Sequence, residues 1–61
     1  MKHSLFMENI YGETIEIYWY GTDDLLWEEI VQVSVKFGNK IYMFPTAETA
    51  YQWAINNGFI E

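Results

Sequence analysis

The chain has 61 residues, of which 51% are hydrophobic and 20% aromatic, so it is far too apolar for a disordered segment and suits one small domain near the lower size limit of a single core. It has no cysteine, which excludes disulfides and thiolate metal sites. Nine carboxylates against three lysines and no arginine give a net charge of −6, which argues against direct binding of nucleic acid or of an anionic membrane and would attract a basic partner.

The hydrophobic residues are dispersed along the chain. No apolar run approaches the roughly 20 residues that a membrane-spanning helix needs. The first residues, Met1 to Leu5, do not have the pattern of a secretory signal peptide. We therefore expect a soluble, cytoplasmic protein.

Two alternating runs, 2–10 and 13–20, predict a first β-hairpin. The connection from Asn9 to Gly12 is typical of a type I turn closed by a left-handed glycine. This register places Met7 opposite Ile15 and leaves Leu5, Ile17 and Trp19 on the same face. The residues expected on the opposite face are Phe6, Glu8, Glu16, Tyr18 and Tyr20.

The segment between the two hairpins carries weaker signals. Gly21 to Asp24 has the composition of a turn. Leu25 to Glu28 shows no clear periodicity, so two structures remain open. One is a single helical turn capped by Thr22 or Asp23, and the other is an early start of the next strand.

A second hairpin is predicted around the two-residue loop Gly38-Asn39. In the run 30–37, one face is expected to carry Val31, Val33, Val35 and Phe37. The loop pairs these residues with the next strand, so that Tyr42 and Phe44 join the valine face while Ile41 and Met43 lie opposite. Pro45 is expected to end this strand, because proline lacks the backbone donor of a sheet ladder.

The C-terminal part predicts one helix from Ala47 to Asn57. Thr46 is the expected N-cap, Glu48 lies in the first turn near the positive end of the dipole, and Gly58 ends the helix. Phe59 and Ile60 are expected to fold back on the last turn. The buried stripe is predicted from helical spacing to consist of Ala47, Ala50, Tyr51, Ala54 and Ile55.

These elements predict one α+β domain over residues 1–61, a four-stranded antiparallel β-meander with one C-terminal α-helix packed on one face (ββββα). No constellation typical of an enzyme accompanies them. His3 is the only histidine, and the adjacent Ser4 points to the other face of the strand, so His3 is expected to be exposed and without a role. The glycines lie at scattered turns and form no phosphate-binding loop, and Lys36 and Lys40 beside the second turn suggest solubility or edge protection. We expect no catalysis, no cofactor and no metal.

The densest carboxylate group is Asp23, Asp24, Glu28 and Glu29. Its spacing lacks the alternating ligands and the glycine bend of a calcium loop. A chain of this size with one helix also leaves little room for the cleft of a two-carboxylate hydrolase. The two interpretations left are a solvated acidic turn and a recognition patch for a basic partner.

Aromatic residues form a third candidate group, Tyr11, Tyr18, Tyr20 and Trp27. Because one helix can cover only one face of the sheet, the other face is expected to expose large apolar groups, as interfaces do. The residues expected there are Phe6, Tyr18, Tyr20, Ile41 and Met43, interleaved with Glu8 and Glu16. The alternative is that residues 25–27 fold over this face and cover part of it.

Two functions are compatible with these features. The first is a small acidic protein-binding module, an inhibitor or adaptor whose carboxylates imitate a phosphate backbone and occupy a basic, nucleic-acid-binding surface of a larger protein. By analogy of size, such proteins are typical of phages and mobile elements. The alternative is a homodimeric structural protein with no decoy role, whose uncovered sheet faces pair. The expected protein-binding residues are Phe6, Glu8, Glu16, Tyr18, Tyr20, Asp23, Asp24, Glu28, Glu29 and Met43.

Overall fold

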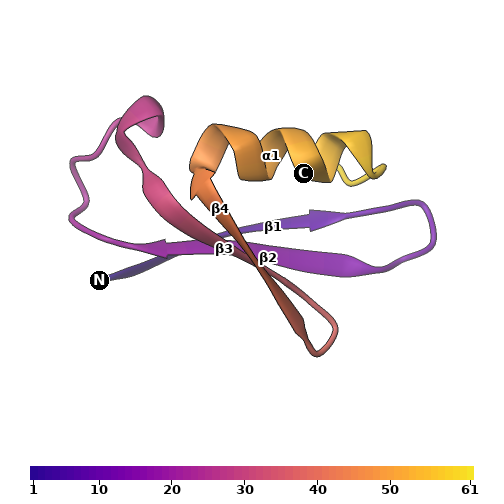
Figure 1. The fold of residues 1–61 in the computed structure, drawn as a ribbon. Helices are drawn as coiled ribbons and strands as arrows, with labels where there is room; N and C mark the ends of the chain where they lie inside the picture. Colours follow the sequence, from indigo (N-terminus) through magenta and orange to yellow (C-terminus); the bar gives the residue numbers. More distant parts are fainter.

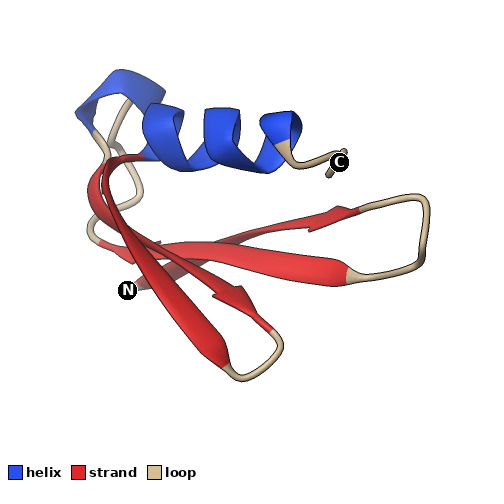
Figure 2. Ribbon diagram, turned by 45° about the vertical axis from the view of Figure 1, so that its right-hand side comes forward, coloured by secondary structure: helices blue, strands red, loops and turns tan.

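The computed structural model describes all 61 residues and confirms the ββββα architecture (Figure 1). The strands form one antiparallel sheet in the order β1-β2-β3-β4, and the helix lies across one face of it (Figure 2). The elements are β1 (Lys2–Glu8), β2 (Thr14–Tyr20), the 3-10 turn η1 (Trp27–Glu29), β3 (Val31–Phe37), β4 (Lys40–Thr46) and α1 (Ala47–Asn56).

The first hairpin has the predicted turn and register. Met7 lies opposite Ile15 and Leu5 opposite Ile17. Gly12 adopts a φ of 80°, which glycine reaches without the steric cost of a Cβ, and its amide donates to the carbonyl of Asn9 at 3.1 Å. The Asn9 side chain accepts from the amides of Tyr11 and Glu13, so the turn satisfies its own polar groups.

The second hairpin also has the predicted pairing, with Phe37 opposite Lys40 and Val35 opposite Tyr42. Pro45, however, does not end the strand, because β4 continues to Thr46. β4 is an edge strand, so one of its sides has no neighbour and tolerates a residue without an N–H group. The two hairpins are joined by only three β2–β3 residue pairs, and they diverge from one another beyond this short contact (Figure 2).

The alternation predicted for β3 fails at its start. Gln32 has a φ of 56°, an unfavourable backbone conformation for a residue with a Cβ. In the residues before Gln32, the side chains that point toward the core alternate with the opposite phase. As a result, Val31 is 54% exposed while Ile30 is buried. The carbonyl of Ile30 accepts from the amide of Ala47 at 2.9 Å, which ties this segment to the first residue of the helix.

The connection between the hairpins forms a 3-10 turn, η1, and neither Thr22 nor Asp23 caps it. The Glu29 carboxylate instead accepts from the Leu26 amide at 2.9 Å at the start of the turn. The hydroxyl of Thr22 donates to the carboxylate of Asp24. Trp27 does not cover the outer sheet face, because it packs edge-to-face on Trp19 and Tyr51, on the helix side of the sheet.

Helix α1 begins as predicted. The Thr46 hydroxyl accepts from the Thr49 amide at 3.1 Å, and the Thr49 side chain lies 3.3 Å from the amide of Thr46, which completes a reciprocal cap. Gly58 has a φ of 87° and ends the helix in the left-handed conformation. The predicted stripe is correct for its three alanines, which are fully buried, but Ile55 is 39% exposed.

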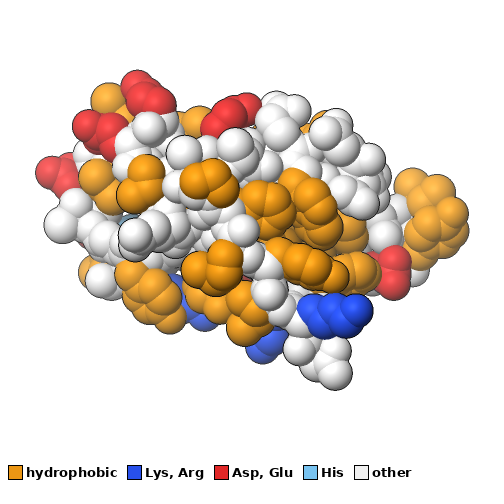
Figure 3. Space-filling model, viewed as in Figure 1, with side chains coloured by type: hydrophobic (Ala, Val, Ile, Leu, Met, Phe, Trp, Pro, Cys, Tyr) orange, Lys and Arg blue, Asp and Glu red, His pale blue; other side chains and the backbone are white.

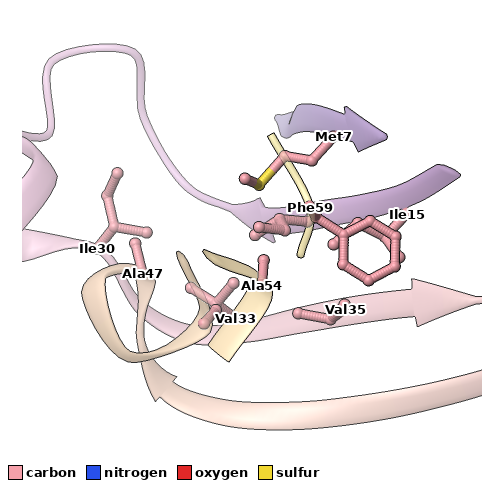
Figure 4. Packing of buried hydrophobic residues seen from close by; sticks show 10 residues of the cluster. Met7, Ile15, Ile30, Val33, Val35, Ala47, Ala54 and Phe59 are labelled. Carbon is pink, nitrogen blue, oxygen red and sulfur yellow. The ribbon is translucent and has the colours of Figure 1, made fainter. Parts of the chain in front are cut away.

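The core lies between the helix and the inner face of the sheet (Figure 4). The alanines let the helix backbone approach the strands closely, and Phe59 folds back under the helix as predicted. The Ile60 side chain is 64% exposed, although its backbone exchanges two hydrogen bonds with Glu8 on the open edge of β1. The buried hydrophobic residues are Met7, Ile15, Ile17, Ile30, Val33, Val35, Ala47, Ala50, Ala54 and Phe59.

Candidate protein-binding surfaces

The sheet face opposite the helix, here termed the outer face, exposes large aromatic, aliphatic or thioether side chains from β1, β2 and β4. The antiparallel register brings Phe6 of β1, Tyr20 of β2 and Met43 of β4 to this face, and their exposed fractions are 63%, 68% and 68%. Ile41 is 55% exposed, and Tyr18 is partly buried, with its ring edge-to-face against Tyr20. The placement of these residues away from the core agrees with the predicted alternation.

A polar network crosses the same face around Glu16. Its carboxylate accepts from the Ser4 hydroxyl at 2.7 Å and lies 3.2 Å from the Lys2 ammonium. Lys36 is its cross-strand neighbour on β3. The hydrogen bond from Ser4, together with Lys2, holds the pKa of Glu16 below its ordinary value. The Lys2 ammonium also lies 4.6 Å from the centre of the Tyr18 ring.

These contacts balance the charge of the outer face. The positive charges of Lys2 and Lys36 offset the negative charges of Glu16 and of the exposed Glu8, which lies at the end of β1. Glu16 therefore differs from the other predicted contact carboxylates, because it alone forms a salt bridge with a lysine of the chain. The outer face is amphipathic and close to neutral.

The second surface, here termed the acidic end, surrounds η1 and the first turn of α1. Asp23 and Asp24 precede η1, and Glu28 and Glu29 lie within it. The Trp27 indole Nε1 donates to Oε1 of Glu48 at 2.7 Å, which adds the first turn of the helix to this group. Five of the nine carboxylates thus lie at one end, whereas the lysines lie along the opposite side of the molecule (Figure 3).

The only basic side chain that the acidic end contacts is His3. Its Nε2 lies 3.5 Å from Oδ1 of Asp23 and 3.2 Å from the carbonyl of Gly21, and its ring stacks on Trp19. His3 was expected to be exposed, but its side chain is 24% exposed and contributes to the contact between β1 and the turn after β2. Ser4 points to the other face, as expected.

A cleft of about 340 Å³ adjoins the acidic end. Trp27 and Tyr51 form two of its walls, with ring centres 5.9 Å apart and planes at 90°. Oε2 of Glu48 accepts from Gln52 at 3.0 Å, and the Tyr51 hydroxyl donates to Glu61 at 3.4 Å. The lining residues are Leu5, Trp27, Glu48, Tyr51 and Glu61.

Sequence reasoning did not associate the residues of this cleft. Glu48 and Tyr51 are spaced by three positions, which places them one above the other on a helix, and this is the only local signal. The expected aromatic cluster was wrong, because Tyr11 is 81% exposed at the first hairpin tip and Trp27 packs on the helix side. The aromatic partners of Trp27 are Trp19, on the preceding strand β2, and Tyr51, on the helix, which is distant in sequence.

The hydrogen bonds from Trp27 and Gln52 hold the pKa of Glu48 below its ordinary value. The pKa of Tyr51 is raised, first by partial burial of its hydroxyl and then by the negative charges of Glu61 and Glu48. Neither glutamate forms a salt bridge with a basic group of the chain. The cleft therefore combines aromatic walls with carboxylates that lack a cationic partner.

A second hollow, of about 320 Å³, lies at the free edge of β1 near the first turn, where Phe6, Ile10 and Ile60 contribute apolar surface.

Nowhere in the chain do three carboxylate or imidazole groups come together in a way that could hold a metal ion. The single α-helix is too short and too polar to cross a lipid bilayer. Comparison of the chain with models of protein families, with curated proteins and with solved structures gives no match.

Proposed function

We propose that this protein is a small acidic protein-binding module, an inhibitor or adaptor that occupies the basic, nucleic-acid-binding surface of a larger protein. The observation that supports this function best is the acidic end, where Asp23, Asp24, Glu28, Glu29 and Glu48 gather and the lysines are absent. Clustered carboxylates steer a basic partner during encounter and can replace the phosphates that it would otherwise contact.

The geometry of these groups favours such a role. The pKa of Asp24 is lowered by the hydrogen bond from Thr22 and that of Glu48 by the hydrogen bond from Trp27, so both carboxylates are ionised at neutral pH. Glu29 is fixed by the Leu26 amide. Carboxylates that are already oriented lose less conformational entropy on binding than freely rotating ones.

The test measures capture of a basic probe by two variants that each lose two negative charges. In Asp23→Asn with Glu28→Gln the charges are lost from the acidic end, and in Glu8→Gln with Glu13→Gln they are lost from β1 and the first turn. We expect immobilised decalysine to retain the wild type and the control variant at low salt and to lose the acidic-end variant. If both variants were retained equally, the position of the carboxylates would make no difference, and the role proposed for the acidic end would be refuted.

A lysate capture with mass spectrometry then names the partner. The proteins retained by the wild type should be nucleic-acid-binding proteins, and added nucleic acid should release them, because the two ligands compete for one basic surface. Captured proteins that remain bound in the presence of excess nucleic acid would contradict the decoy role.

A second candidate, the homodimeric structural protein, is favoured by the exposed side chains of the outer face. Phe6, Tyr20 and Met43 are each more than 60% exposed, and such groups are enriched in interface cores. This function predicts a particle of twice 7.3 kDa at high concentration. Met43→Glu should dissociate it, whereas Ile10→Glu, at the first hairpin tip, should not. A monomer at every concentration contradicts it.

A further inference from the structure

The cleft beside the acidic end has the composition of a receptor for a single positive charge. Its walls include the rings of Trp27 and Tyr51, which contact each other edge-to-face with their centres 5.9 Å apart, and Glu48 and Glu61 also line it. The π faces of aromatic rings attract cations, most strongly in the case of tryptophan. Carboxylates next to such rings add direct charge attraction, so a cationic group gains from both kinds of wall.

The chain itself supplies no cation to this cleft. Its salt bridges join Lys2 to Glu16 and His3 to Asp23, and neither Glu48 nor Glu61 takes part in one. Trp27 is 37% exposed, so its ring remains accessible to a ligand. The raised pKa of the Tyr51 hydroxyl, which burial causes first and Glu61 and Glu48 reinforce, is consistent with a negative potential at this site.

The hydrogen bonds of Glu48 distinguish between the two basic side chains of proteins. Oε1 accepts from Trp27 at 2.7 Å and Oε2 accepts from Gln52 at 3.0 Å. The paired hydrogen bonds of an arginine require a suitably directed free lone pair on each oxygen of one carboxylate, and here each oxygen already accepts one bond. A lysine ammonium is compact and needs only one remaining lone pair, and its methylene chain can lie along Leu5 and the rings.

We propose that the cleft lined by Leu5, Trp27, Glu48, Tyr51 and Glu61 binds one lysine side chain of a partner protein. This inference rests on the proposed function, because the lysine belongs to the basic surface that the acidic end approaches. The acidic end provides long-range attraction, and the cleft selects one lysine and fixes the register of the two proteins.

The test uses a blocked Gly-Lys-Gly tripeptide and follows the protein by NMR. Of the three tryptophan indole N–H signals, that of Trp27 should shift in a saturable manner, with a dissociation constant on the order of 1–10 mM. The tripeptide with norleucine in place of lysine should leave this signal unmoved. An equal shift with norleucine would overturn the proposal, since the cleft would then be merely apolar.

Variants locate the binding energy. Glu48→Gln with Glu61→Gln should weaken binding by about fivefold or more, while the control Glu8→Gln with Glu13→Gln removes the same charge and should change it less than about twofold. Glu61→Gln alone is the second variant, because the one hydrogen bond of the Glu61 side chain is the exposed one that it accepts from Tyr51, and we expect its loss to leave the fold intact. Equal weakening by the two double variants, or tighter binding of a Gly-Arg-Gly tripeptide, would overturn the assignment to lysine.

The outcomes separate this inference from the proposed function. If the protein is retained on decalysine through the acidic end but Gly-Lys-Gly does not shift the Trp27 signal, the lysine cleft is refuted and the acidic module stands. If Gly-Lys-Gly binds in the cleft but the acidic-end variant is retained on decalysine as well as the wild type, the cleft stands and the acidic module is refuted.

Discussion

Val31 and Val33 should respond differently to the same truncation, although they share a strand and a predicted face. Val33 is fully buried, while Val31 is 54% exposed because the alternation breaks at Gln32. Valine to alanine removes two methyl groups, each worth about 0.8 kcal/mol when fully transferred from water. The transfer loss is therefore about 1.6 kcal/mol for Val33 and about 0.7 kcal/mol for Val31. A residual cavity raises the cost at Val33 to about 2–3 kcal/mol.

The assay is urea unfolding followed by circular dichroism, with thermal unfolding as a second measurement. A domain of this length has a total stability of about 3–9 kcal/mol, so the titrations are made in sulfate, which strengthens apolar burial. In thermal unfolding, Val33→Ala should lower the midpoint by about 10–20 °C and Val31→Ala by about 3–5 °C. Ile30→Val provides a third, milder probe of the position that replaces Val31 in the core, with an expected cost of about 1 kcal/mol.

Equal losses for Val31→Ala and Val33→Ala would show that both valines face the core. The break at Gln32 would then be absent, and the strand would alternate regularly from Ile30 onwards. A cost for Ile30→Val close to zero would support the same conclusion, because Ile30 is buried only if the alternation changes at Gln32.

Four further outcomes are expected. Thr46→Ala removes the helix cap and should cost about 1 kcal/mol in urea unfolding, while a change within error would contradict the capping role. Gly58→Ala places a Cβ at a φ of 87° and should cost about 1 kcal/mol in the same assay. Met43→Gln, on the outer face, should change the stability of the monomer by less than about 0.5 kcal/mol. The pKa of Glu16 is lower in the folded state. Its contribution to the free energy of unfolding is therefore present above about pH 4.5 and is lost as the pH falls through the folded-state value. Between pH 6 and 3, the urea midpoint of Glu16→Gln should thus decline less than that of the wild type.

The hairpins could be predicted from the sequence because their information is local. Gly12 requires a left-handed conformation that only a few turn types use, and each of these turns fixes the pairing of the adjacent strands. The same holds for Thr46 and Gly58, since a cap and a C-terminal glycine act within one helical turn. Turn chemistry and alternation agreed, and this agreement fixed the fold class.

The errors occurred where distant contacts override local signals. Gln32 has no sequence feature that marks a positive φ, and this conformation follows from the requirement to connect η1 and bury Ile30 beneath Ala47. Ile55 has helical spacing typical of the stripe but lies at its margin, where the narrow sheet no longer covers it. The cleft was missed for the same reason, because Trp27 and Tyr51 meet only in the folded chain.

The fold separates two properties that the sequence had combined on one surface. Glu16 lies among the exposed rings of the outer face, but Lys2, Lys36 and Ser4 balance or bind it, so this face has little net charge. Five of the carboxylates without a lysine salt bridge lie at the acidic end. A basic partner drawn to the acidic end would therefore leave the outer face open, and binding there and self-association through the outer face can occur in the same molecule. Charge neutralisation at the acidic end should then leave any dimerisation unchanged, and Met43→Glu should leave the binding of a basic partner unchanged.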